Sequence, residues 1–155
     1  MMVDMVEMLG AQAAPISYEE VYSSLQRRKV DGAENNWPSY ESMNHNEVAK
    51  YFTVDEHTRI PEIQLCSKHT WEKLDEKDRE IILACARESA LYERELWKKR
   101  EKESMEKVIG EGTVVTELSQ EEKEEFRRAT EDIYEEYCGA YMYIVEKIRM
   151  LGEGS

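Results

Sequence analysis

The sequence predicts an α/β protein that contains one very long helix. Two segments with the composition of strands, 48–54 and 60–66, lie between segments with helical periodicity, which is the pattern of an α/β fold. The helical pattern that starts at residue 76 continues to about residue 109, where Gly110-Glu111-Gly112 breaks it. A helix of that length extends roughly 50 Å at about 1.5 Å per residue, so we expect it to bridge two bodies.

Length, charge and composition exclude several classes of protein. The 155 residues, of which 41% are hydrophobic, suffice for one compact domain or part of a larger one. A net charge of −13 repels nucleic acids and anionic lipids, so we expect no nucleic-acid partner. No segment is apolar and long enough to span a bilayer, and residues 1–7 do not have the pattern of a signal peptide. The three widely spaced cysteines form no zinc or dithiol motif, and we expect them to be small buried hydrophobes.

The first forty residues predict helix, strand, helix and loop. A short helix over 3–9 ends at Gly10, and residues 11–16, which contain a proline, suit an edge strand. Ser17 is placed to cap a helix over 18–28. Residues 30–40 contain Gly, Pro and two adjacent Asn without any period, which is typical of a loop, and such loops often carry function.

The long helix is predicted to be capped by Asp75 and to pack only at its N-terminal end. Before it, Ser67 or Thr70 is placed to cap a short helix that ends near Leu74. The long helix carries an apolar stripe first and a wholly polar run, 98–103, afterwards; the stripe consists of Ile81, Cys85, Ser89, Tyr92 and Leu96. A strand over 113–116 follows, then a capping box at Ser119 and Glu122 that opens the final helical region, which Gly139 is expected to split.

No motif for catalysis or metal binding is apparent. His45, His57 and His69 lie twelve residues apart, and no pair has the i, i+3 or i, i+4 spacing of helical metal ligands. Glu34 and Glu41 form the kind of acidic pair that an acidic chain contains by chance, and no nucleophile has a partner at motif spacing. We therefore expect no enzyme, no catalytic residue, no metal and no cofactor.

The segment Asn35-Asn36-Trp37 offers the chemistry of a binding site. Amide side chains both donate and accept hydrogen bonds, and an aromatic ring can cover the apolar face of a ligand. The alternative is an Asn-rich turn in which Trp37 anchors the loop to the core. Tyr18, at the start of a predicted helix, is open to the same two interpretations, a pocket wall or ordinary packing.

Three motifs resemble one family of transport proteins. They are Ser17-Tyr18-Glu19-Glu20-Val21-Tyr22-Ser23-Ser24-Leu25-Gln26, Val30-Asp31-Gly32-Ala33-Glu34-Asn35-Asn36, and Asp55-Glu56-His57-Thr58-Arg59-Ile60-Pro61-Glu62. They are similar to the solute-binding subunits (DctP type) of TRAP (tripartite ATP-independent periplasmic) transporters. The chain is about half as long as members of that family and resembles their C-terminal half. The resemblance implies the C-terminal half of a two-lobed periplasmic-binding-protein-like (type II) fold, with the long helix running across both lobes.

The resemblance also implies lobes, ligand and partners. Residues 1–59 would belong to lobe two, 60–98 to a return segment of lobe one, and 99–155 to the closing part of lobe two. The ligand would be an organic acid, either a C4-dicarboxylate or a sugar acid such as a uronate, and the partners would be the membrane subunits of the transporter. The family's location is periplasmic or otherwise extracytoplasmic. Because lobe one is incomplete, the chain is expected to expose apolar surface, to self-associate and to bind ligand poorly by itself.

Ligand-binding residues are assigned by the same resemblance. Asn35 matches the asparagine that contacts the ligand carboxylate, and Tyr18 matches an aromatic position that lines the pocket. Asn36 and Trp37 follow at positions that vary with substrate class, and we expect Trp37 and Tyr40 to stack on a sugar ring. His57 is expected where the lobes meet, either in the pocket or at the hinge, or as an ordinary interface histidine. The arginine that pairs with the carboxylate falls in the segment before residue 1, and Arg27, Arg28 and Arg59 do not occupy its position.

Two other classes compete with this interpretation. One is an acidic helical interaction protein, built on the helices over 76–109 and 120–150, that binds no small molecule. A coiled-coil seam would favour it, but the apolar stripe ends after Trp97. The other is an enzyme acting on organic acids, which requires a nucleophile or metal set that the sequence does not show.

Overall fold

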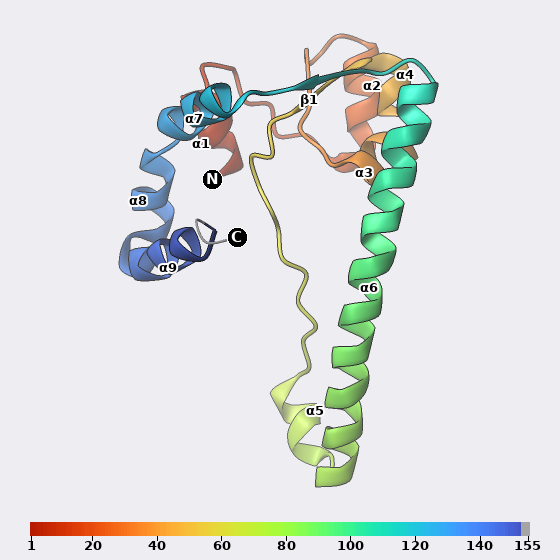
Figure 1. The fold of residues 1–155 in the computed structure, drawn as a ribbon, viewed down its shortest axis with the longest axis vertical. Coiled ribbons are helices and arrows are strands. Elements are labelled where there is room, and N and C mark those ends of the chain that lie inside the picture. The colour runs from red at the N-terminus through yellow and green to blue at the C-terminus, as the bar shows by residue number, and fades with distance from the viewer. Residues whose placement is uncertain (153–155) are drawn as a thin grey trace. The chain divides into compact units, whose positions relative to one another are not determined.

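The computed structural model describes residues 1–152, which combine helices with a small sheet and confirm the predicted α/β class (Figure 1). Contacts between residues divide the chain into two units. The first comprises Met1–Gly32, Thr53–Asp55 and Thr116–Ser155, and the second comprises Ala33–Phe52 and Glu56–Val115. The elements in chain order, with η for a 3-10 helix, are α1 (Met2–Met8), η1 (Tyr18–Glu20), α2 (Val21–Gln26), α3 (Trp37–Ser42), α4 (His45–Val48), β1 (Tyr51–Val54), α5 (Lys68–Lys73), α6 (Glu76–Gly110), β2 (Val114–Glu117), α7 (Gln120–Ala129), α8 (Asp132–Cys138), η2 (Gly139–Tyr141) and α9 (Met142–Gly152).

The strands β1 and β2 pair to form the sheet of the described chain. At its start the backbone N–H of Val114 donates to the carbonyl oxygen of Lys50 at 2.8 Å. Two of the four boundaries between the units fall within these strands, after Phe52 and after Val115, and the other two follow Gly32 and Asp55.

Two expected strands are absent from the described residues. The segments 11–16 and 60–66 have no strand structure, and the side chains of Ile60, Ile63 and Leu65 are largely exposed. A strand is stable only when a neighbouring strand pairs with its backbone groups. In the described chain no third strand is available for pairing, so the strand-like composition of 11–16 and 60–66 was not sufficient to make either segment a strand.

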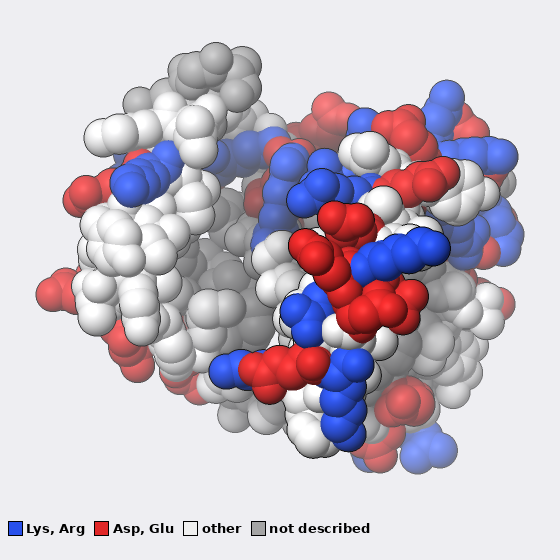
Figure 2. All heavy atoms as spheres, turned by 90° about the horizontal axis from the view of Figure 1, so that it is seen from below, with Lys and Arg blue, Asp and Glu red and all other residues white. Residues whose placement is uncertain are grey.

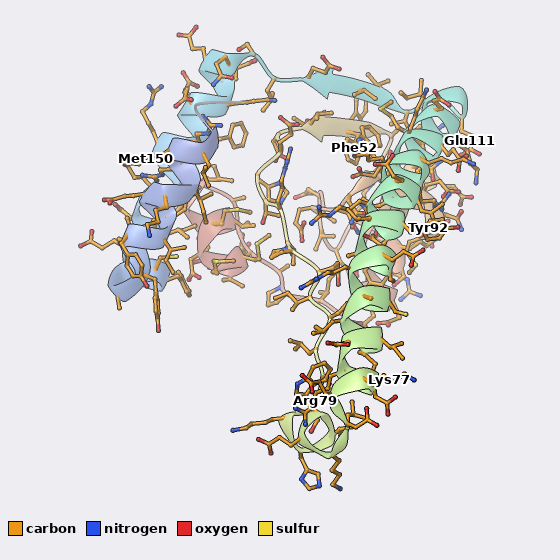
Figure 3. The ribbon with its side chains drawn as sticks, turned by 60° about the horizontal axis from the view of Figure 1, so that its bottom comes forward. Phe52, Lys77, Arg79, Tyr92, Glu111 and Met150 are labelled. Carbon is orange, nitrogen blue, oxygen red and sulfur yellow. The ribbon has the colours of Figure 1, made fainter. Side chains whose placement is uncertain are left out.

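The helix α6 is 35 residues long and begins where the sequence predicts. The carboxylate of Asp75 accepts a hydrogen bond from the backbone N–H of Asp78 at 2.8 Å, which caps the first turn. The guanidinium of Arg79 donates to the carbonyl oxygens of Trp71 at 3.0 Å and Glu72 at 3.2 Å. Arg79 therefore fixes α5 against the start of α6 (Figure 3).

The burial along α6 is the reverse of what the sequence predicts. In the N-terminal half the apolar stripe is exposed, with exposed fractions of 51% for Ile81 and 67% for Tyr92. In the C-terminal part Ser104 and Val108 are completely buried, because α3 packs on this section of the helix. The described chain supplies no element to cover the stripe, whereas α3 packs on the polar C-terminal part of α6.

The free cysteines are not the buried residues that the sequence predicts. Cys66 and Cys85 are exposed and Cys138 is half-buried, so the expectation of buried cysteines was wrong.

In the first unit, the structure confirms the capping box and the glycine break that the sequence predicts. The hydroxyl of Ser119 accepts from the backbone N–H of Glu122 while the Glu122 carboxylate accepts from the backbone N–H of Ser119, which completes the capping box of α7. The hydroxyl of Tyr137 on α8 donates to the Asp4 carboxylate of α1 at 2.5 Å. Gly139 opens η2 and so separates α8 from α9, as expected.

The surface of the protein carries both signs of charge in close mixture. On the face drawn in Figure 2, blue basic and red acidic side chains alternate and neither forms a large separate patch. Exposed ion pairs on α6 join residues one turn apart, such as Lys99 with Glu103 and Lys102 with Glu106, each at 3.7 Å. Exposed pairs of this kind contribute little to stability but keep a long helix soluble.

Candidate functional site

The segment that the sequence marks as a loop ends earlier than expected, because α3 begins at Trp37. The side-chain oxygen of Asn36 accepts a hydrogen bond from the backbone N–H of Ser39 at 2.9 Å, so Asn36 is the N-cap of α3. Pro38 lies in the first turn, where its missing N–H has no intrahelical partner to lose. The residues 37–40, predicted as loop, are therefore helical, and the polar segment is held at a helix start.

Both asparagines use their side-chain oxygens to order the backbone. The oxygen of Asn35 accepts from the N–H of Asn36 at 2.9 Å, and that of Asn36 caps α3. The Nδ2 groups of both residues remain as the atoms that can donate to a ligand. The same residues therefore set the backbone conformation and carry donors suited to a carboxylate or hydroxyl.

Trp37 is stacked on an aromatic ring that the sequence analysis missed. Its ring lies against Phe52 of β1 with centroids 3.7 Å apart and planes at 19° (Figure 3 labels Phe52). Phe52 occupies a strand position and carries no distinguishing motif. Because Phe52 covers one face of the half-buried Trp37, a ligand cannot stack on that face.

Tyr40 belongs to the core and not to a ligand surface. Its side chain is 5% exposed, and its hydroxyl donates to the carbonyl oxygen of Ala49 at 2.6 Å and lies 3.3 Å from the hydroxyl of Thr113. Burial raises the pKa of the Tyr40 phenol. The expectation that Tyr40 stacks on a sugar ring together with Trp37 was therefore wrong.

His57 lies beside the acidic residue that precedes Asn35. Its Nε2 is 3.5 Å from a carboxylate oxygen of Glu34, and the side chain of His57 is the more buried of the two. The contact connects the segment after β1 with the segment before α3. The structure thus brings His57 to the immediate neighbourhood of the Asn35–Trp37 segment.

Tyr18 is placed in the first unit, whereas Asn35, Asn36, Trp37 and His57 all lie in the second. It is the first residue of η1 and is 44% exposed, and Ser17 precedes the helix without a side-chain cap. The predicted single helix over 18–28 is thus a 3-10 turn followed by the short helix α2.

The second carboxylate considered for acid or base chemistry forms ion pairs instead. Glu41 on α3 accepts hydrogen bonds from both Arg100 and Lys107 of α6. The Lys107 ammonium and then the Arg100 guanidinium lower the pKa of Glu41, against the opposing effect of burial. A carboxylate held ionised between two cations is a poor general acid.

The side chains that this region brings together are amide, aromatic and imidazole groups. In residues 1–152 no three His, Cys, Asp or Glu side chains are grouped to hold a metal ion. None of the described helices has the length together with the apolar composition needed to cross a bilayer. The distinctive features are two asparagine amides and a stacked indole beside a histidine–carboxylate contact.

Comparison with known proteins identifies the family of this chain. Residues 1–139 match DctP, the bacterial extracellular solute-binding proteins of family 7. A solute-binding protein of Chromohalobacter salexigens is 39% identical over 135 residues, which is 87% of this chain and 40% of the relative.

Solved structures agree with this match. A TRAP periplasmic solute-binding protein of C. salexigens with bound d-glucuronate has a TM-score of 0.85 and 34% identity, and the similarity covers 99% of this chain and 50% of that one. A Sulfitobacter protein of the same type with bound β-d-galacturonate has a TM-score of 0.82 and 39% identity, over 94% and 48% of the two chains. The chain thus spans about half the length of its relatives. It belongs to the DctP family of bacterial extracellular solute-binding proteins and shares the fold of the TRAP periplasmic solute-binding proteins.

Proposed function

We propose that this chain provides the amide and aromatic part of a uronate-binding site in the solute-binding protein of a TRAP transporter. The observation that carries the proposal is the Asn35–Trp37 segment, in which two amide donors adjoin an indole with one face covered by Phe52. Support comes from the relatives that bind d-glucuronate and β-d-galacturonate. Both ligands combine a carboxylate with a sugar ring.

Each part of a uronate matches a group in this segment. The Nδ2 of Asn35 suits a carboxylate oxygen, and that of Asn36 suits a carboxylate or a ring hydroxyl. The uncovered face of Trp37 suits the apolar C–H face of a sugar ring. A C4-dicarboxylate has no ring to use that face, so we propose a sugar acid over a dicarboxylate.

Tyr18 and His57 have supporting roles in this proposal. Tyr18 lines the ligand pocket with its exposed ring. His57, held beside Glu34 at 3.5 Å, keeps the segment before Asn35 in place and contributes to the pocket or the hinge. By the family resemblance, the arginine that forms a two-pronged contact with the carboxylate is none of Arg27, Arg28 and Arg59.

The proposed mechanism is binding without chemistry. In the whole protein two lobes close over the anion, and the ligand favours the closed form because it has higher affinity for it. The loaded protein then docks onto the transporter's membrane subunits in the periplasm or another extracytoplasmic location. This role requires no catalytic residue, metal or cofactor.

The test compares this chain with a chimera. In the chimera, the 135 residues that align with the C. salexigens relative replace the matching region of that protein, and the rest of the relative is kept. Both proteins are titrated with d-glucuronate, d-galacturonate and succinate by calorimetry and by thermal shift. A ligand at 100 times its Kd stabilises the native state by about 2.7 kcal/mol, which is a measurable shift.

The expected result is uronate binding by the chimera, with weaker or no binding by the chain alone and no response to succinate. Replacing Trp37 by Leu in the chimera should weaken uronate binding, while Tyr51→Leu, on the exposed side of β1, should not. If the folded chimera binds no uronate, or prefers succinate, the proposal is wrong.

A further inference from the structure

The residue Glu41 is buried although it is charged. It lies one helical turn after Trp37 on α3, and it is 8% exposed. A buried carboxylate is unfavourable unless it is paired and hydrogen-bonded. Its partners therefore indicate what the residue does in the fold.

The two oxygens of Glu41 have separate cationic donors. Arg100 donates to one oxygen and Lys107 to the other, and the two cations are seven residues apart on α6. Seven residues are about two turns of an α-helix, so both side chains extend from one face of α6. The cations are 44% and 54% exposed, whereas the carboxylate between them is 9% exposed. Glu41 is thus the inner member of a clamp that joins α3 to α6.

A second contact holds the other side of α3. The ring of Tyr40 meets Phe52 at 5.0 Å between centroids, and its hydroxyl donates to the carbonyl oxygen of Ala49. Phe52 in turn carries the stacked ring of Trp37. The short helix α3 is therefore fixed by neighbouring residues, Tyr40 toward β1 and Glu41 toward α6.

We propose that Glu41 is a positioning residue: its clamp by Arg100 and Lys107 holds α3 on α6, and so keeps the donors of Asn35 and Asn36 and the ring of Trp37 in the geometry that accepts the ligand. This inference rests on the proposed function, because it assigns those three residues to the ligand. Its physical basis is preorganisation, since a segment that is already ordered loses less entropy on binding.

The primary test measures hydrogen exchange in the 155-residue chain without ligand. The variant is Glu41→Gln, which keeps the shape of the side chain and removes its charge. The matched control is Glu103→Gln, which also removes one negative charge. Glu103 forms an exposed ion pair with Lys99, and both of these residues are on α6. We expect amide exchange over residues 36–42 to become about tenfold faster in E41Q and to stay unchanged in E103Q.

The pattern of exchange separates positioning from general destabilisation. If E41Q acts through α3, the helices α7 and α9 exchange as in the unchanged chain, and the double variant E41Q/R100Q resembles E41Q because the clamp is already broken. Faster exchange in every helix, or unchanged exchange over 36–42, would contradict the proposal.

The second test measures d-glucuronate affinity of the chimera that carries the same substitutions, at a temperature where all variants are folded. We expect E41Q to weaken binding about tenfold and E103Q to leave it within about twofold. Faster exchange together with unchanged affinity would overturn the positioning role. If the unchanged chimera binds no d-glucuronate, the proposed binding role fails, while the exchange test still decides whether Glu41 orders the segment.

Discussion

The indole of Trp37 lies flat on the ring of Phe52, with centroids 3.7 Å apart and an interplanar angle of 19°. The two residues come from different elements, the first turn of α3 and the strand β1. The contact therefore couples the orientation of the candidate ligand surface to the strand. It also closes the face of the indole that lies on Phe52 to a ligand.

Removing the Phe52 ring should release Trp37. For Phe52→Ala we expect a loss of about 2 kcal/mol in unfolding free energy, less than for a fully buried ring because Phe52 is half-buried. The fluorescence of Trp37, recorded with Trp71→Phe and Trp97→Phe in the background, should shift toward the red. Tyr51→Ala is the control, because Tyr51 is adjacent but 81% exposed. An unchanged spectrum for Phe52→Ala would show that Phe52 does not hold the indole.

The two roles of Asn36 can be separated by substitution. Asn36→Ala should cost about 1 kcal/mol in unfolding free energy, because the first turn of α3 loses its cap. Asn36→Ser keeps a capping oxygen and removes the Nδ2 donor. We therefore expect thermal unfolding of Asn36→Ser to match the unchanged chain while uronate affinity in the chimera falls. Equal affinity in Asn36→Ser and the unchanged chimera would limit Asn36 to capping.

The clamp on Glu41 should weaken in acid. Lys107, followed by Arg100, lowers the pKa of Glu41 below its ordinary value of 4.5, and the partner carboxylate raises the pKa of Lys107. A carboxyl group whose pKa is lower in the folded state stabilises the fold above its unfolded pKa and loses that contribution as pH falls through its folded pKa.

Urea unfolding of the unchanged chain and of E41Q at a series of pH values tests this dependence. We expect the difference in unfolding free energy between the two proteins to be constant near neutral pH and to shrink below about pH 4.5. A difference that stays constant through the acid range would mean that the charge of Glu41 contributes nothing.

The exposed apolar stripe on α6 should cause self-association of the isolated chain. Exposed fractions are 51% for Ile81, 67% for Tyr92 and 47% for Leu96. A contiguous apolar surface of this kind is removed from water when two copies meet. We expect sedimentation velocity to show larger species as the protein concentration rises.

Replacing Ile81 and Tyr92 together by Lys should shift the chain toward the monomer. Lysine favours the helical state nearly as well as alanine, so α6 should persist. The control Glu80→Lys on the same helix changes the net charge by the same amount and leaves the stripe intact. Identical sedimentation of both variants would assign any effect to charge alone.

Local signals in the sequence predicted the helix boundaries that depend on neighbouring residues. Asp75 caps α6, Ser119 and Glu122 form the capping box of α7, and Gly139 separates α8 from α9, each as expected. These features join groups within a few residues of one another, and their geometry follows from the chain itself. The motifs around Asn35 likewise led to the correct family.

The lobe boundaries and the ligand roles of Tyr18, Asn35, Asn36, Trp37 and His57 remain predictions. The strand expected over 60–66 failed because the described chain offers no partner strand. Strand composition indicates that a segment can pair, but the pairing itself depends on another part of the chain.

The sequence by itself determined the α/β class, the length of α6, its N-cap and the capping box of α7. Each of these follows from local periodicity or from side chains that bind their own backbone. Only the tertiary structure decided which end of α6 is buried and what Glu41 does. Glu41 is 59 residues from Arg100 and 66 from Lys107, and the ring of Trp37 finds Phe52 on another element. Contacts over such separations carry no local pattern, since they depend on how the elements pack in three dimensions.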